Sequence, residues 1–295
     1  MDIGLNLPIM APGLDRERTV EWCRRIDEGP WSSLAAGERI SYPNPELFTL
    51  LGAAAVLTER VRLVTNVTVV GLHDPVLLAK QLATLDMLSN GRLTVGVGVG
   101  GREEDYRAVG ADWQGPKAVA HMEQAVARMR ATWSGTPSHP EALRPVEPFP
   151  IQAGGPPILV GALGPRSIRR AARYADGVLS FSFGLDRAEV ANAFKTARTA
   201  WLEADRDPPR LVTGAFVALG EDADRRMEDY LRRYLNFLGP AAEYAIPVAR
   251  LRDVPRLREA LAAAEDLGAD EILITPTTID PDEVDRLADA CFGAS

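Results

Sequence analysis

Short apolar runs rich in Val, Ile and Leu alternate along the chain with longer segments in which apolar residues recur at helical spacing. A strand buried on both faces has a short continuous apolar run, whereas a helix packed on a sheet carries a single apolar face. The alternation therefore predicts repeated β-α units and a parallel sheet. Eight strands are predicted, at Asp2–Pro8, Trp31–Ala36, Val61–Val69, Arg92–Val99, Pro157–Gly161, Gly177–Phe181, Leu211–Leu219 and Glu271–Thr275.

Eight β-α units are typical of a closed (β/α)8 TIM barrel, and 295 residues suffice for one such domain covering residues 1–295. One interval departs from the regular spacing. Ala111–Pro156 contains a helical stretch, Pro116–Trp133, followed by a loop rich in Pro and Gly. We interpret this interval as an insertion after strand four, which could cover the barrel mouth.

Composition narrows the function classes. The formal net charge is −8 and arginine is scattered among acidic residues, so nucleic acid is not an expected partner. Cys23 and Cys291 are too few for a disulfide framework or a metal cluster, and no metal site is expected. The chain begins without a signal-like segment and has no long apolar run, so we expect a cytoplasmic protein that does not associate with membranes.

Active sites of parallel barrels form at the carboxyl ends of the strands, which directs attention to two glycine-containing segments. Gly96–Gly101 closes strand four, and its glycines could admit a phosphate or a flat ring close to the backbone. They could equally make room for bulky neighbours inside the barrel. Gly161–Ser167 follows strand five and begins a helix, so it suits an anion, although an ordinary helix start would have the same pattern.

Polar residues near other strand ends are candidates for contact with a ligand. Glu38 and Arg39 follow strand two and could steer protons or anchor a substrate, or could form an internal ion pair. His73 follows strand three, where a lone histidine more often has only a hydrogen-bonding role. Asn66 places a polar group within the otherwise apolar strand three and needs partners there, which a ligand ring could supply. Because hydrolase and nucleotide-binding motifs are absent, a cofactor is expected to carry the reaction.

The chain resembles the bacterial luciferase-like family in several consecutive segments. The first part of the match runs through Thr58–Leu63, Asp74–Asp86 and Ser89–Leu93 into the glycine-rich strand four. The second combines Pro157–Gly161 with Ser167–Gly177. These segments occur in the order and spacing of the family, which makes the combination much more specific than a glycine motif alone.

The resemblance implies a barrel that binds coenzyme F420 for hydride transfer, or reduced FMN for reactions with oxygen. It implies a non-proline cis peptide at Asn66-Val67, behind the cofactor ring. The residues that it implies for cofactor binding are Asn66, Val67, Val99, Gly100, Gly101, Ala162, Leu163, Gly164 and Ser167. It also implies a homodimer, although packing of helices on the barrel would explain their apolar faces without one.

One departure from the family concerns the proton donor or acceptor. Many F420-dependent members have an Asp-His pair at the end of strand two, whereas this chain has Glu38-Arg39. We rank Glu38 first as the catalytic residue, with Arg39, His73 and Asn6 as further candidates. The sequence does not identify the substrate.

The leading hypothesis is an oxidoreductase that transfers hydride between F420 and a small organic substrate. The alternatives are a monooxygenase that uses reduced FMN and oxygen, and a non-catalytic flavin- or deazaflavin-binding protein. A lyase or isomerase acting on a phosphorylated metabolite is disfavoured, because no predicted strand clearly ends in lysine.

Overall fold

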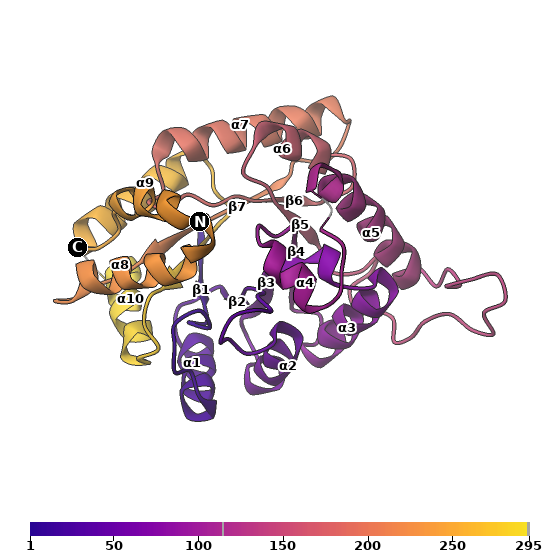
Figure 1. Ribbon diagram of the computed structural model, residues 1–295, viewed down its shortest axis with the longest axis horizontal. Coiled ribbons are helices and arrows are strands. Elements are labelled where there is room, and N and C mark those ends of the chain that lie inside the picture. Colours follow the sequence, from indigo (N-terminus) through magenta and orange to yellow (C-terminus); the bar gives the residue numbers. More distant parts are fainter. Residues whose placement is uncertain (114, 294–295) are drawn as a thin grey trace.

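The computed structural model, which describes residues 1–113 and 115–293, contains a closed barrel of parallel strands in sequential order (Figure 1). The barrel closes where β1 pairs with β8, with Ile3 opposite Ile272. This confirms the predicted (β/α)8 barrel, and every predicted strand is present with its ends moved by a few residues at most. The strands are β1 (Asp2–Asn6), β2 (Ser33–Ala36), β3 (Arg62–Val69), β4 (Leu93–Gly98), β5 (Ile158–Gly161), β6 (Gly177–Leu179), β7 (Arg210–Val217) and β8 (Glu271–Pro276).

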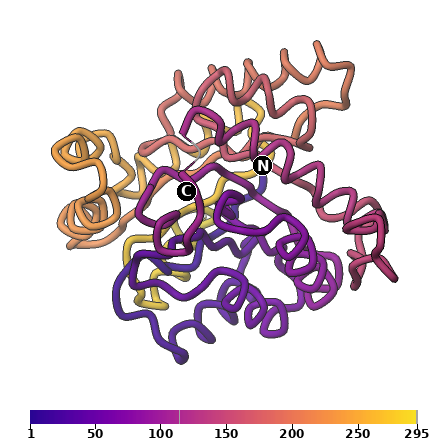
Figure 2. The backbone as a smooth tube through the Cα atoms, turned by 45° about the vertical axis from the view of Figure 1, so that its right-hand side comes forward, coloured from indigo at the N-terminus to yellow at the C-terminus, as the bar shows by residue number. Residues whose placement is uncertain are grey.

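Helices surround the barrel and connect successive strands (Figure 1). The α-helices are α1 (Arg16–Glu28), α2 (Leu47–Leu57), α3 (Pro75–Leu88), α4 (Glu103–Ala108), α5 (Ala118–Trp133), α6 (Pro165–Ala171), α7 (Arg187–Glu203), α8 (Ala223–Tyr234), α9 (Val254–Asp266) and α10 (Asp282–Phe292). Short 3-10 segments are η1 (Val70–Leu72), η2 (Gly115–Lys117), η3 (Asn236–Tyr244) and η4 (Ile246–Val248). Figure 2 shows the orange part of the chain, with α8, η3 and η4, as coils at one side of the barrel.

The interior of the barrel is filled, so a ligand can enter only from one end. An apolar cluster comprises Ala35, Val64, Leu159, Leu179, Val212 and Leu273. At the amino ends of the strands, the buried carboxylate of Glu271 accepts hydrogen bonds from Ser33 Oγ at 2.6 Å and from Arg210 at 2.8 Å. This polar cluster closes the bottom of the barrel, which leaves the carboxyl ends of the strands for a binding site.

The Pro- and Gly-rich loop between strands four and five does not cover the barrel mouth, whereas Val119 and Met122 in the helix of the same interval line the cavity there. That helix, α5, packs beside α3, where Trp133 Nε1 donates to the carbonyl of Ala79 at 2.9 Å, and serves as the barrel helix after β4. The loop after α5 projects from the side of the molecule (Figure 1). The Gln152 amide donates to the Leu93 carbonyl at the start of β4, at 2.8 Å. The expectation of a lid was therefore wrong for this loop, because the chain must return to the bottom of the barrel before β5 begins.

Three further features bear on the sequence-based expectations. Burial raises the pKa of Cys23 and of Cys291 to about 12, so both thiols stay protonated at neutral pH. None of the described helices is long and apolar enough to cross a membrane. Leu77 in α3 and Val56 in α2 are exposed, and the homodimer remains a prediction.

Candidate active site

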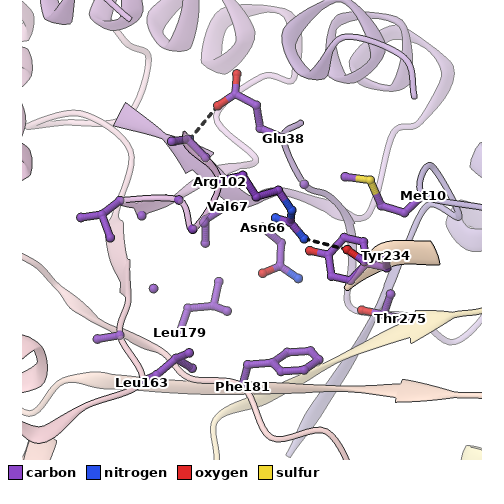
Figure 3. Close-up of a pocket in the computed structure, with 18 of the residues that line it drawn as sticks. Met10, Glu38, Asn66, Val67, Arg102, Leu163, Leu179, Phe181, Tyr234 and Thr275 are labelled. Carbon is purple, nitrogen blue, oxygen red and sulfur yellow. Dashed lines mark hydrogen bonds between the residues drawn. The ribbon is translucent and has the colours of Figure 1, made fainter. Parts of the chain in front are cut away.

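A cavity of about 540 Å³ lies at the carboxyl ends of the barrel strands (Figure 3). Its volume suits a small-molecule site. All nine residues predicted to bind the cofactor line it, and so do Glu38 and Asn6. Arg39 and His73 are not among the residues that line the cavity.

Val67 forms part of the cavity floor, and glycines from two neighbouring strands make room for it. The Asn66-Val67 peptide is cis, as the resemblance implies, and the β3–β4 register shifts between Thr65 and Thr68. A Cβ at Gly98 would lie 2.6 Å from Val67 Cγ2, and one at Gly161 would lie 3.2 Å from Val67 Cγ1. The interpretation that the strand-four glycines accommodate bulky neighbours is therefore correct for Gly98.

A substitution at Gly98 tests this packing. We expect Gly98→Ala to lower the free energy of unfolding by about 1–3 kcal/mol, because the new methyl group overlaps Val67. Val67→Ala removes the overlapping methyl groups, so the double variant should recover stability in a double-mutant cycle measured by urea unfolding. Gly52→Ala is the control, because a Cβ there has nothing within 4 Å. Strictly additive effects of Gly98→Ala and Val67→Ala would contradict the packing argument.

The side of the cavity formed by the segments after β4 and β5 can receive an anion. Gly164 is the N-cap of α6. It has no side chain that could accept hydrogen bonds from the N–H groups of the first turn. Ser167 in that turn lines the cavity, as do Gly100 and Gly101 on the facing segment. Gly100 has a φ of 63°, which favours glycine. The arrangement suits a phosphate between two backbone segments.

A second side of the cavity has a short chain of amide contacts. Asn66 Nδ2 donates to Asn6 Oδ1 at 3.0 Å. Asn6 Nδ2 in turn donates to the Ile274 carbonyl and to Thr275 Oγ1, both at 3.1 Å. These contacts satisfy Asn6 within β1 and fix the direction in which the Asn66 side chain points. The partners that the two asparagines need are thus supplied in part by each other.

Glu38 brings a buried carboxylate to the edge of the cavity (Figure 3). Its Oε2 accepts from the backbone N–H of Val69 at 2.6 Å, and its Oε1 lies 2.8 Å from His73 Nε2. The imidazole is also in edge-to-face contact with Phe48, with ring centroids 5.5 Å apart. Glu38 therefore lines the cavity with a carboxylate whose two oxygens contact Val69 and His73, and Figure 3 shows that carboxylate directed away from Asn66 and Val67. The structure places a carboxylate–imidazole pair here, although the two residues are 35 positions apart.

Arg39, in contrast, is engaged away from the cavity. Its Nε donates to Asp105 Oδ2 at 2.8 Å, and both side chains are buried. Asp105 Oδ1 accepts from the backbone N–H of Ser41 at 2.7 Å. The guanidinium carbon also lies 4.7 Å from the centroid of the Tyr42 ring. Arg39 therefore forms an internal ion pair with Asp105 from α4 and not with Glu38, which contacts His73 instead.

Comparison with known proteins assigns the chain to a family. A family model described as luciferase-like monooxygenase matches residues 4–284. The chain belongs to this family.

Two groups of similar proteins accompany the match to the luciferase-like monooxygenase family. The phthiodiolone/phenolphthiodiolone dimycocerosates ketoreductase of Mycobacterium sp. (strain JLS) is 35% identical over 208 residues, which is 64% of this chain and 52% of that protein. The chain thus spans about half the length of the curated relatives that it matches.

Solved structures with the same fold are more distant in sequence. The monooxygenase RslO1 from Streptomyces bottropensis has a TM-score of 0.77 at 24% identity, with 98% of each chain covered. An F420-dependent secondary alcohol dehydrogenase in complex with an F420-acetone adduct has a TM-score of 0.79 at 16% identity, with 100% of this chain and 99% of that chain covered. At these identities the likeness shows the shared fold.

Two features of this luciferase-like site were missed by sequence reasoning. Arg102, next to the glycine segment, lines the cavity and donates to the Tyr234 carbonyl at 3.1 Å (Figure 3). Phe181, Phe216 and Tyr230 line the opposite side. Proximity of Arg102 to the glycines was a signal for its position, whereas the aromatic residues come from segments that only the folded barrel brings together.

Proposed function

We propose that this protein is an F420-dependent oxidoreductase that interconverts a carbonyl compound and the corresponding alcohol. The observation that carries the proposal is the Glu38–His73 pair at the edge of the cavity. Such a pair can hold and exchange the proton that accompanies hydride transfer to or from a carbonyl group. It supplies a carboxylate and an imidazole, the two groups of the Asp-His pair that many F420-dependent relatives carry after strand two.

The residues of the cavity fit a flat cofactor with a phosphate-bearing chain. The glycine positions 98 and 161 leave space beside Val67 that side chains would fill. The free first turn of α6 and the backbone of Val99–Gly101 provide N–H donors for a phosphate. When bound there, the deazaflavin would supply or accept a hydride.

Each part of the site has a proposed role. Asn66 and Val67 support the back of the ring, while Val99–Gly101 and Ala162–Ser167 bind the phosphate and its chain. Glu38 donates or accepts a proton through the oxygen that His73 contacts, and His73 positions that carboxylate. Arg39 holds the segment after β2 against α4 through Asp105. We therefore assign Arg39 a positioning role.

The names of two similar proteins support this reaction class. One curated relative is a ketoreductase, and one protein of the same fold is an F420-dependent secondary alcohol dehydrogenase. Both names describe reactions between a carbonyl group and an alcohol. The comparison with the monooxygenase RslO1 favours the alternative, in which reduced FMN and oxygen react.

An anaerobic turnover assay tests the proposed function. Purified protein is mixed with reduced F420 and a panel of ketones, and the visible absorbance of oxidised F420 is followed. We expect oxidation of the coenzyme that depends on both protein and ketone, and proceeds without oxygen. Turnover only with reduced FMN and oxygen would overturn the proposal in favour of a monooxygenase.

A further inference from the structure

We propose that the substrate is a planar aromatic carbonyl compound with an acidic group, which stacks on the aromatic side of the cavity and pairs with Arg102. This inference rests on the proposed function, because it assigns the half of the same cavity that the cofactor leaves free. It names a substrate class from the side chains that line that half.

Part of the cavity is lined by an aromatic wall, defined as Phe181, Phe183, Phe216, Tyr230 and Tyr234. Its rings come from the ends of β6 and β7 and from α8. The Phe181 and Phe216 centroids are 4.9 Å apart with planes inclined by 66°, and those of Phe216 and Tyr230 are 5.3 Å apart. These spacings are typical of favourable edge-to-face contacts. An aromatic ring of a substrate can make the same kind of contact with the wall.

The aromatic residues of the chain are concentrated at this cavity. The sequence has eight Phe and six Tyr, and five of these residues line this one cavity. The cofactor side, in contrast, is lined by glycines and small aliphatic residues such as Ala162 and Val67. The cavity is therefore divided into a smooth side for the cofactor and a side of inclined aromatic rings, which favours a flat apolar substrate over a flexible aliphatic one.

A second feature of the cavity is the charge of Arg102. Its guanidinium carbon lies 4.6 Å from the Tyr234 ring centroid and 4.1 Å from that of Phe237, and it donates to the Tyr234 carbonyl at 3.1 Å. Among the described residues no carboxylate forms an ion pair with it, and its buried Nε has no hydrogen-bond partner. A cation that lines the cavity and has no acidic partner among the described residues points to an anionic ligand group.

The direction of Arg102 favours the substrate over the cofactor phosphate as its partner. All of its described contacts are with Tyr234 and Phe237, which belong to the end of α8 and to η3. Arg102 directly follows the Val99–Gly101 segment assigned to the phosphate, but its side chain contacts the end of α8 and η3.

Binding of simple probes to the full-length chain tests the inference without turnover. We would measure 2-naphthoate, its saturated analogue decahydro-2-naphthoate, and the neutral 2-acetylnaphthalene by calorimetry, with and without F420. We expect 2-naphthoate to bind at least about fivefold more tightly than the saturated acid, because only the flat ring gains from the aromatic wall. Equal affinities for the two acids would overturn the aromatic assignment.

Variants of the two features separate their contributions. Arg102→Met should weaken 2-naphthoate about tenfold and leave 2-acetylnaphthalene and F420 nearly unchanged, while Arg102→Lys should restore part of the loss. Phe216→Leu should weaken both aromatic probes by about fivefold. Arg107→Met is the matched control, because Arg107 is exposed on α4 and pairs only with Glu103 in the described contacts. Thermal unfolding checks that each variant is folded.

The outcomes distinguish this inference from the proposed function. If Arg102→Met weakens F420 or inorganic phosphate and spares 2-naphthoate, Arg102 belongs to the cofactor site and the inference is wrong. If 2-naphthoate binds as expected but the protein binds no F420, the proposed function fails while the substrate-side assignment stands.

Discussion

Replacement of Glu38 by Gln is expected to lower the turnover number with F420 by about 100-fold or more, the usual contribution of a positioned acid or base. The amide is nearly isosteric and can still accept the Val69 N–H that the Glu38 carboxylate accepts at 2.6 Å. It cannot exchange a proton with His73 as a carboxylate does. We therefore expect the affinity for F420 and the unfolding temperature to change little while turnover falls.

Glu46→Gln provides a matched control for this experiment. Glu46 is also a glutamate near His73, but it caps α2 by accepting the N–H groups of Phe48 and Thr49 and does not line the cavity. Its replacement should leave turnover nearly unchanged. A Glu38→Gln enzyme with unimpaired turnover would rule out proton transfer by this carboxylate.

Introducing an acid at Gly164 is expected to reduce the affinity for F420 by about 100-fold or more. Gly164 has extended backbone angles, φ −115° and ψ 153°, and a Cβ there meets nothing within 4 Å. Asp is a favoured N-cap, so Gly164→Asp should fold normally and its carboxylate should accept the first-turn N–H groups of α6. Those are the groups assigned to the phosphate, and a like charge beside it costs several kcal/mol.

Gly164→Ala separates charge from bulk at the same position. Its methyl group occupies the same open space but takes no N–H donor, so the F420 affinity should remain within about threefold of the original. Both affinities can be measured by fluorescence titration, alongside thermal unfolding. If the stably folded Gly164→Asp variant binds F420 with unchanged affinity, the phosphate does not bind at this turn.

The barrel could be predicted because its strands are buried on both faces and leave mostly apolar runs, as in Leu211–Leu219. The turn after β5, which lines the cavity, could be predicted from its small residues at a helix start. The insertion was misread because composition marks a loop without saying at which end of the barrel it lies. The order of elements decides that, since a loop from a helix to the next strand starts at the bottom.

The chemistry of the site depended on contacts that no local pattern contains. Glu38 and His73 meet because β2 and β3 are neighbours and the chain turns through η1 after β3. Arg102 reaches Tyr234 across 132 positions of sequence. Arg39 and Glu38 are adjacent, yet they point to different partners. The direction of a side chain at the end of a strand could therefore be determined only from the three-dimensional structure.

Titration of the purified protein with F420 and with FMN tests most directly whether the cavity binds F420 for hydride transfer. The chain has five Trp residues, so intrinsic fluorescence can report binding of each cofactor in its oxidised and reduced forms. We expect saturable binding of F420 at micromolar concentrations and no comparable response to FMN. Tight binding of FMN with no binding of F420 would contradict this expectation.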